Sequence, residues 1–249
     1  MNWKYLIGKY MNGIEEKLTR FDSSFVKKHF PFGRNWIFDL KRILNKDTIN
    51  IIDVGANIGS VSKELSYYFP NSTIFAFEPI NSTFTLLKDN TKLNNNIKSF
   101  HCALGSIKEN MEILINKENT INSIKGQNYN PDNYSGSEEI KVIRLDEFAE
   151  TENISRIGIL KIDVEGFEFE VLEGCGNLLK GNIDCILLEV GYEREPTKVH
   201  FSDVEIYLEK YNFQLCGVYE IMRNLNDKRR ISYSNNLYIK KDILLQNEQ

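Results

Sequence analysis

The sequence predicts an α/β fold: a doubly wound, mostly parallel β-sheet with helices on both faces. Two observations predict it. From residue 49 onward, short apolar runs rich in β-branched residues alternate with amphipathic helical segments, the pattern of parallel strands joined by crossover helices. The last two apolar runs are separated by a polar segment that is too short for a parallel crossover. We therefore expect the sheet to end in an antiparallel edge strand.

Composition limits the class of protein. The chain has 249 residues, of which 41% are hydrophobic and 27% charged, an ordinary globular mix. This length suits one domain plus a small extension. We expect an N-terminal helical extension over residues 1–48 and one domain over residues 49–249. The net charge of −4 argues against a nucleic-acid partner, because such modules usually carry a strong basic excess.

The N-terminal segment and the cysteines bear on location. The first residues contain no apolar stretch long enough for a signal peptide or a membrane span. Basic residues are frequent there, which favours a solvated helical face, with peripheral contact to an acidic membrane as the alternative. Four scattered cysteines without a C-x-x-C motif fit buried free thiols in a reducing compartment. We expect a cytoplasmic protein.

The spacing of hydrophobic residues along the chain predicts the individual helices and strands. Helices are expected at residues 36–44, 60–69, 81–93 (opened by Asn81 as N-cap), 167–180 and 202–211 (opened by a capping box from Ser202 to Glu205). Strands are expected at residues 49–55, 71–79, 97–105, 111–117, 139–145, 157–166, 183–191, 213–221 and 235–241.

A polar insert at residues 118–139 separates two of these strands. It is rich in Asn, Gly and Ser and has little hydrophobic periodicity. A loop of this length in a compact domain is usually a functional flap or a disordered segment. It contains Tyr129 and Tyr134, and aromatic rings suit the faces of sugars. The insert is therefore a candidate to close over a glycan acceptor, with an ordinary loop as the alternative.

The turn in the stretch IIDVGANIG is the first candidate ligand site. Gly55 and Gly59 permit positive φ and a close approach of ligand to backbone. The next helix begins there with unpaired N–H groups, and open α/β sheets bind ligands beyond the carboxyl ends of their strands. Asp53 ends the strand and is expected to face the same crevice. The alternative is a tight turn whose glycines serve packing only.

Glu78, in FAFEP at the end of the second expected strand, indicates the class of ligand. A carboxylate at this place accepts both hydroxyls of a ribose. The preceding turn reads D-x-G-x-x-x-G and lacks the middle glycine of the G-x-G-x-x-G fingerprint, which lets a pyrophosphate contact the backbone. The combination indicates a nucleoside cofactor and favours S-adenosylmethionine over NAD or FAD.

The stretches IIDVGANIG, FAFEP, CALG, RLDEF and LKIDVEGFEFEVLEG, in this order and spacing, resemble the FkbM family of S-adenosylmethionine-dependent methyltransferases. The resemblance covers about residues 49–190, more than half of the chain. It implies a seven-stranded, Rossmann-like class I methyltransferase fold. It also implies methyl transfer to oxygen, often a sugar or natural-product hydroxyl.

Carried over onto this sequence, the family pattern implies a set of contacts with S-adenosyl-L-methionine. Those contacts are Asp53, Gly55, Asn57 and Gly59 at the methionine end, Glu78 at the ribose, Cys102 and Ala103 beside the adenine, and Asp163 near the sulfonium.

Asp163, Glu165 and Glu189 are the candidate catalytic residues. A sugar hydroxyl is a poor nucleophile unless it loses its proton as the new bond forms, so a general base or a metal ion is expected. Asp163 and Glu189 lie at or near strand ends and should share one crevice. Three carboxylates together could bind Mg²⁺. The alternative is that Glu165 and Glu189 cap helices or pair with Lys161 and Arg194.

His200, in the loop EREPTKVHF, is a further candidate base, with a surface histidine without a role as the alternative. Three functions stay open: an O-methyltransferase acting on a glycan, glycolipid or natural product, a nicotinamide-dependent oxidoreductase, and a catalytically silent module that kept the cofactor pocket. The missing middle glycine argues against the second, and the intact acidic residues argue against the third. The acceptor and the oligomeric state stay open.

Overall fold

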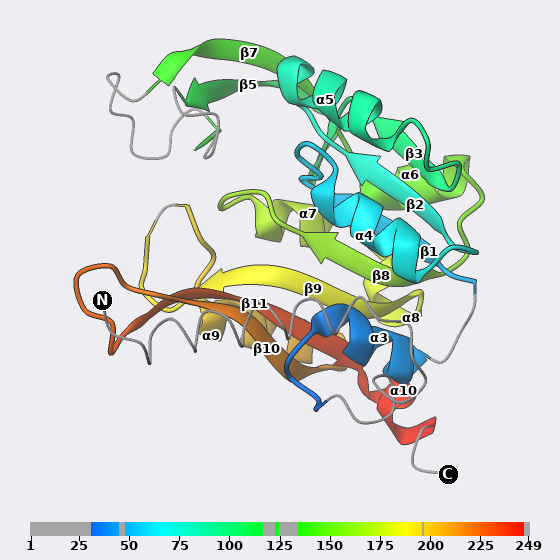
Figure 1. Cartoon of the computed structure of the whole chain (residues 1–249), viewed down its shortest axis with the longest axis vertical. Coiled ribbons are helices and arrows are strands. Elements are labelled where there is room, and N and C mark those ends of the chain that lie inside the picture. Colours follow the sequence, from blue (N-terminus) through cyan, green and yellow to red (C-terminus); the bar gives the residue numbers. More distant parts are fainter. Residues whose placement is uncertain (1–30, 45–47, 117–122, 125–133, 196, 247–249) are drawn as a thin grey trace, which may run out of the picture.

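The computed structural model describes residues 31–44, 48–116, 123–124, 134–195 and 197–246. These residues form a seven-stranded main sheet with helices on both faces and a smaller second sheet at one end (Figure 1). The strand order of the main sheet is β10-β11-β9-β8-β1-β2-β3. The doubly wound α/β architecture expected from the sequence is confirmed.

The direction of each strand follows from the length of its connection. The strands of the main sheet are β1 (Asn50–Val54), β2 (Thr73–Phe77), β3 (Ile97–Phe100), β8 (Ile157–Ile162), β9 (Ile183–Gly191), β10 (Phe213–Arg223) and β11 (Ile231–Lys240). The first five of these run parallel. β11 runs antiparallel to both β9 and β10, as expected for a pair joined by a short polar turn. Because β1 pairs with both β2 and β8, the topological switch point lies between β1 and β8.

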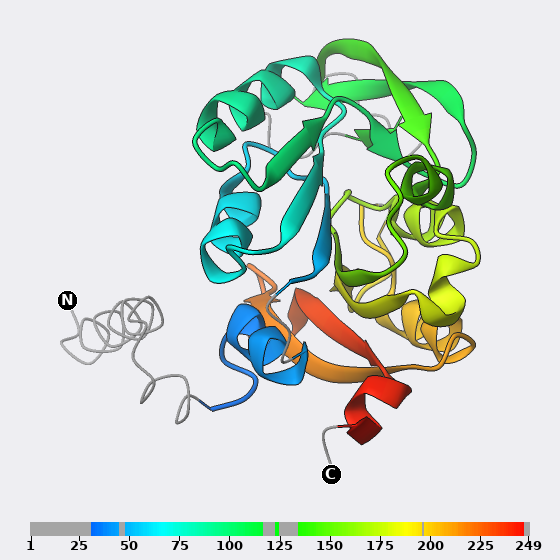
Figure 2. The same cartoon turned by 90° about the vertical axis from the view of Figure 1, so that its right-hand side faces the viewer.

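Two separate helical layers cover the main sheet (Figure 2). One layer contains α3 (Trp36–Leu44), α4 (Ser60–Tyr68), α5 (Asn81–Thr91) and α10 (Lys241–Gln246), and the other contains α6 (Leu145–Thr151), α7 (Glu168–Gly174), α8 (Leu178–Gly181) and α9 (Phe201–Glu209). Adjacent residues of a strand serve opposite layers: Ile51 packs toward α3 and α4, and Ile52 packs toward α6 and α7. Every residue of β8 and β9 is buried, which explains why these strands are nearly continuous apolar runs rather than alternating ones.

The small sheet stands over the loop that follows β2. Its strand order is β4-β7-β5-β6, with β4 at Ala103–Leu104, β5 at Glu109–Asn116, β6 at Ser123–Ile124 and β7 at Tyr134–Ile143. Ile113, Ile140 and Val142 form a separate apolar cluster with Ile80, which precedes α5. The small sheet is thereby fixed next to the carboxyl end of β2.

Two strand predictions need correction. The run expected as one strand at residues 97–105 divides at His101 and Cys102, so that β3 belongs to the main sheet and β4 to the small one. Part of the expected polar insert, from Tyr134 onward, belongs to β7, which pairs with β5. Pairing with a neighbouring strand orders polar residues that show no hydrophobic period of their own. Tyr129 lies outside the described residues.

Two helix predictions also differ. α5 begins at Asn81 with Ile80 as its N-cap, and the Asn81 N–H donates to Glu138 Oε1 at 3.0 Å. The helix expected at residues 167–180 divides into α7 and α8 at a turn in which Gly176 has a φ of 50°. The start of α5 and the break between α7 and α8 thus involve a side-chain contact and a glycine backbone conformation, which the spacing of hydrophobic residues does not predict.

The described part of the expected N-terminal extension packs into the core of the domain. Ile37 and Leu40 of α3 are buried against the main sheet. Asp39 on the same helix is fully buried, and its Oδ2 accepts a hydrogen bond from the Tyr219 hydroxyl of β10 at 2.7 Å. The Gly33 N–H donates to the same oxygen at 2.7 Å. A buried carboxylate therefore joins α3 to the outermost strand.

All four cysteines are thiols in the structure. Cys102, Cys175 and Cys185 are buried, and Cys216 is exposed. Within the described part of the chain, no helix has the length and apolar character needed to cross a membrane.

Replacing Tyr219 with Phe removes one donor from the buried Asp39 carboxylate. We expect the free energy of unfolding to fall by about 1–3 kcal/mol, the cost of leaving a buried acceptor short of a donor. Urea unfolding followed by circular dichroism measures the change. Tyr67→Phe, at a side chain that is 61% exposed, is the matched control and should stay within about 0.5 kcal/mol of the parent. Equal losses in both variants would contradict the role of this bond.

Candidate functional site

A cavity opens at the carboxyl ends of β1, β2 and β8, next to the small sheet. Its polar lining includes Asn57, Glu78, Thr83, Asp163 and Glu165. Its apolar lining includes Phe77, Ile80, Leu104, Ile113, Ile140 and Phe167. The cavity therefore lies at the switch point where open α/β sheets bind ligands, with an apolar wall and a few convergent polar groups.

The turn between β1 and α4 contributes bare backbone to this cavity. Gly55 has a φ of 72°, and a Cβ added there would lie 1.9 Å from the carbonyl oxygen of Asp163. Only glycine fits, because the turn and the chain leaving β8 approach each other so closely. Asn57 also lines the cavity and has a left-handed φ of 51°.

Two residues expected at the cofactor lie behind the cavity lining. Asp53 is completely buried; its Oδ2 accepts a hydrogen bond from the Ser62 hydroxyl at 2.5 Å, and its Oδ1 lies 3.2 Å from the Lys161 ammonium. Gly59 faces α5, where an added Cβ would lie 2.8 Å from the Leu87 side chain. Asp53 thus ties β1 to α4 and β8, and Gly59 serves helix packing. The expectation of direct ligand contact is corrected for both.

Glu78 lines the cavity at the end of β2, and its carboxylate is held in one orientation. Its two oxygens accept hydrogen bonds from the backbone N–H groups of Asn57 and Ile80, both at 3.0 Å. Burial raises the pKa of Glu78 to about 6, although both N–H donors oppose the rise. Each carboxylate oxygen keeps further acceptor capacity. The side chain is therefore suited to accept hydroxyl groups of a ligand.

Of the two residues expected beside an adenine, Ala103 lines the cavity and Cys102 points into the core. Burial raises the pKa of the Cys102 thiol to about 11. Successive side chains of an extended segment point to opposite sides, so one of the pair faces the ligand and the other the core. The expectation is corrected for Cys102.

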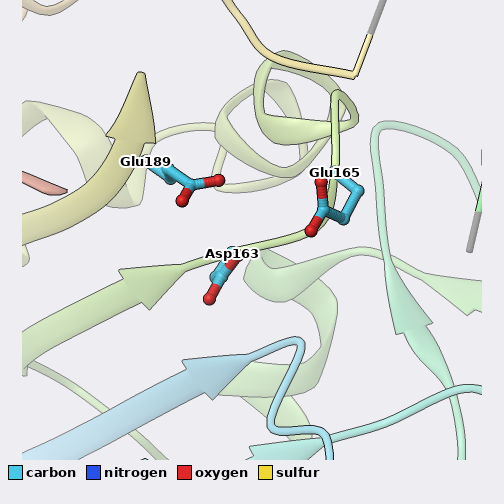
Figure 3. Close-up of side chains that lie close together, drawn as sticks. All are labelled: Asp163, Glu165 and Glu189. Carbon is cyan, nitrogen blue, oxygen red and sulfur yellow. The ribbon is translucent and has the colours of Figure 1, made fainter. Parts of the chain in front are cut away.

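Asp163, Glu165 and Glu189 lie together at the carboxyl ends of β8 and β9 (Figure 3). One carboxylate oxygen from each lies within 4.8 Å of the other two. Asp163 and Glu165 line the cavity, and the buried Glu189 lies beside them. The expectation that neighbouring strand ends bring these three acids into one crevice is confirmed.

Lys198, in the loop between β9 and α9, is the cationic partner of the two glutamates. Its ammonium lies 2.6 Å from Glu165 Oε2 and also contacts Glu189 Oε2. Lys161 and Arg194, the alternative partners that the sequence suggests for these two acids, pair with other residues, and Lys161 lies beside Asp53 and Asp163. Arg194 instead pairs with Asp203 at 2.8 Å.

The three carboxylates do not fit a resident Mg²⁺ in this arrangement. The Lys198 ammonium occupies the space between Glu165 and Glu189, where a metal ion would need their oxygens. The remaining acid, Asp163, lies 3.4 Å from the ammonium of Lys161. The positive charge in the cluster is therefore supplied by the chain's own lysines.

His200 lies outside the cavity lining and caps α9. Its Nδ1 accepts a hydrogen bond from the Ser202 N–H at 3.3 Å and lies 2.8 Å from the Ser202 hydroxyl. The helix begins at Phe201, so the expected capping box from Ser202 to Glu205 is wrong. Because His200 lies outside the cavity lining and its Nδ1 is used at the helix start, the expectation that it acts as a base is corrected.

Glu168, at the start of α7, supports the acidic loop, although the sequence did not single it out. The chain after β8 turns sharply, with positive φ at Glu165 (54°) and Gly166 (99°). Glu168 Oε1 accepts hydrogen bonds from the N–H groups of Gly166 at 3.2 Å and Val164 at 3.4 Å. The side chain is 0% exposed, and burial raises its pKa to about 7. The feature of the sequence that could have indicated this role is the acid that directly follows the stretch IDVEGF.

The family model of the methyltransferase FkbM domain matches residues 53–215, which is more than half of the chain. The chain belongs to the FkbM methyltransferase family. The resemblance seen in the motifs is thereby confirmed, and the matched region contains the β1–α4 turn, Glu78 and the three acids of the crevice.

Several relatives of this FkbM protein are methyltransferases by name. Methyltransferase 1 of Beauveria bassiana is 29% identical over 184 residues, which cover 67% of this chain and 72% of the relative. Hexuronic acid methyltransferase AglP of Haloferax volcanii is 29% identical over 153 residues, covering 59% of this chain and 58% of the relative. Methyltransferase sdnD of Sordaria araneosa is 28% identical over 153 residues, covering 50% of this chain and 59% of the relative. The chain thus spans about three fifths of the length of the last two.

Among solved structures, the METTL16 MTase domain superposes on this FkbM methyltransferase with a TM-score of 0.50. The match covers 83% of this chain and 66% of that one, at 10% sequence identity. An identity this low shows the shared fold alone. The Rossmann-like methyltransferase fold implied by the motifs is confirmed.

Replacing Glu168 with Gln should change how stability depends on pH. The folded-state pKa of about 7 lies above the ordinary value, so its stabilising effect is full below about pH 4.5 and is lost as the pH rises through 7. Relative to Glu168→Gln, the parent should lose on the order of 2–3 kcal/mol of unfolding free energy between pH 5 and 8.

Urea unfolding at a series of pH values measures this difference. Glu173→Gln, at an exposed glutamate of the same helix, is the matched control and should follow the parent at every pH. Parallel curves for the parent and Glu168→Gln would show that Glu168 does not titrate in this way.

Proposed function

We propose that this FkbM methyltransferase binds S-adenosylmethionine in the cavity and transfers the methyl group to a hydroxyl, most specifically a sugar hydroxyl of a glycan, glycolipid or natural product. One observation carries the proposal. A single cavity is lined both by Glu78, an oriented acceptor for ribose hydroxyls, and by Asp163 and Glu165, two acids able to take a proton.

The residues present fit S-adenosylmethionine. The Glu78 carboxylate suits the two ribose hydroxyls, because its orientation is held by two backbone N–H groups. Ala103, Ile113 and Ile140 present an apolar wall that suits a purine ring. Gly55 offers backbone without a side chain to the methionine part. When bound, the cofactor supplies a methyl group on a positively charged sulfur.

The charge of the crevice supports this assignment. Four carboxylates share two ammonium groups, so the fully ionised cluster has two negative charges in excess. The acids are Asp53, Asp163, Glu165 and Glu189, and the cations are Lys161 and Lys198. An excess of negative charge in a partly buried crevice attracts a sulfonium and stabilises a proton released nearby.

Glu165 is the best placed acceptor for the hydroxyl proton. It lines the cavity, and burial raises its pKa although Lys198 opposes the rise. A base transfers protons most effectively when its pKa lies near the working pH. In the proposed step Glu165 accepts the proton as the acceptor oxygen forms its bond to the methyl carbon and the sulfur–carbon bond breaks. Asp163, on the same lining, adds negative charge beside the reacting groups.

The alternatives are less well supported. The family match favours a methyltransferase over a nicotinamide-dependent oxidoreductase. A catalytically silent module would have no use for both Glu78 and Glu165 on one cavity lining. A sugar acceptor is supported by the relative AglP, which is named for hexuronic acid methylation. A cytoplasmic location, the lack of a nucleic-acid partner and peripheral membrane contact stay predictions from the sequence.

Glu78→Ala should weaken the binding of S-adenosylmethionine by about 1–3 kcal/mol, because the ribose hydroxyls lose their acceptor. Isothermal titration calorimetry with S-adenosylmethionine, S-adenosylhomocysteine and NAD measures the affinities. Glu109→Ala, at an exposed glutamate of β5, is the control and should bind like the parent. Unchanged affinity in Glu78→Ala would remove this residue from the site, and binding of NAD alone would refute the methyltransferase assignment of the cavity.

Transfer of labelled methyl groups tests the reaction itself. The protein is incubated with methyl-labelled S-adenosylmethionine and with polysaccharides, glycolipids and free hexuronic acids, and the label is located in an O-methyl group by mass spectrometry. Glu165→Gln should lower kcat by about 10²- to 10⁴-fold, the usual contribution of a general base. Cofactor affinity should fall much less than kcat, since the amide keeps the shape of the side chain and only one of the negative charges of the crevice is lost. Label found on nitrogen or carbon would contradict O-methylation.

A further inference from the structure

We propose that Lys198 is a positioning residue of the methyl-transfer site, which fixes both the place and the charge of the Glu165 carboxylate. The proposal rests on the function proposed above, in which Glu165 accepts the hydroxyl proton. Lys198 itself lies outside the cavity lining and acts through Glu165.

Lys198 is held by two carboxylates and an aromatic ring. Its side chain is 9% exposed, and its ammonium lies between Glu165 Oε2, at 2.6 Å, and Glu189 Oε2. The ring of Tyr233 on β11 lies below the ammonium, with its centroid 5.3 Å away. An ammonium with this little exposure, two carboxylate partners and an aromatic face is strongly fixed in position, because leaving the site would deprive the buried Glu189 and the partly buried Glu165 of their cation.

The loop that carries Lys198 is built to return over the end of β9. The Gly191 N–H donates to the Val199 carbonyl at 2.8 Å, and Gly191 also bridges to His200. A Cβ added at Gly191 would lie 3.0 Å from the Lys198 Cβ, so a larger residue there would crowd the lysine. His200 then caps α9. The cap and the bridge both hold the chain directly after the lysine, which gives His200 a structural role.

Glu165 is thereby held from two sides. Its backbone has a φ of 54°, and the adjoining Gly166 N–H is bound by the buried Glu168. Its side chain is bound by Lys198, which comes from a loop 33 residues further along the chain. The backbone contact alone would leave the carboxylate free to rotate, so the lysine decides where the two oxygens lie.

Lys198 also balances the charges around Glu165. Three acids face Glu165: Asp163 from its own loop, Glu189 from β9 and Glu195 from the loop after β9. The phenol of Tyr233 on β11 lies beside them. In the part of the chain that the structure describes, Lys198 is the cation in contact with Glu165. Without it the acids would favour the protonated form of Glu165, which cannot accept a proton.

Three variants test the proposal. Lys198→Met keeps the length of the side chain without its charge, and Lys198→Arg keeps the charge. Lys98→Met is the control, since Lys98 lies on β3, at the other edge of the main sheet, and pairs with Glu152 at 3.5 Å. The first readout needs neither cofactor nor acceptor. Carbon-13 NMR of the side-chain carboxyl groups gives the pKa of Glu165 in the cofactor-free protein. The second readout is the pH profile of kcat.

In Lys198→Met the pKa of Glu165 should rise by about 1–3 pH units, the usual effect of removing a neighbouring opposite charge. The acidic limb of the kcat profile should move to higher pH by a similar amount, because more Glu165 is then protonated. Affinity for S-adenosylmethionine should stay within about threefold of the parent, since Lys198 lies outside the cavity lining. Lys198→Arg should restore most of the parent behaviour, and Lys98→Met should match the parent in every readout.

An unchanged Glu165 pKa together with an unchanged kcat profile in Lys198→Met would overturn the proposal. Should that variant fail to fold, as judged by circular dichroism, Lys198→Gln provides the same test with a polar side chain. Failure of the proposed function looks different, since the parent itself would then neither bind S-adenosylmethionine nor transfer methyl groups. The NMR titration would still report in that case whether Lys198 controls the charge of Glu165.

Discussion

One close approach organises the site: the backbone at Gly55 passes within contact distance of the Asp163 carbonyl, where no Cβ could be placed. β1 and β8 are parallel neighbours, so the turn after one must pass the chain leaving the other. This approach brings the Asn57 N–H onto the Glu78 carboxylate and leaves Asp163 at the mouth of the same cavity. A side chain at position 55 would separate the two walls that the proposed reaction needs together.

Around this contact, buried and partly exposed charges are arranged in chains that alternate in sign. Asp53 and Asp163 share Lys161, and Glu165 and Glu189 share Lys198. Removing such groups from water is unfavourable unless each finds a partner, and the two lysines provide it for four acids. The same shortage of cations leaves the crevice negative, which suits a positively charged methyl donor. Stability and proposed function thus depend on one set of ion pairs.

Much of the fold could be predicted because its causes are local along the chain. β-branched runs and amphipathic segments predict the strands and helices, and short or long connections predict their directions. The structure departs from the predicted elements where contacts with other parts of the chain decide the local structure. Residues 97–105 divide between two sheets, and α9 takes His200 rather than Ser202 as its cap.

The sequence by itself determined the family, the alternation of strands and helices along the chain, the glycine turn and the acids at the strand ends, because these depend on residue type and spacing. Only the tertiary structure decided which of these residues face the cavity and which lie behind it. Asp53 and Asp163 look alike in sequence, yet one is sealed under the turn and the other lines the cavity. The partnership of Lys198 with Glu165 joins residues 33 positions apart. Such pairings depend on distances in space, which are set by packing and leave no local pattern in the chain.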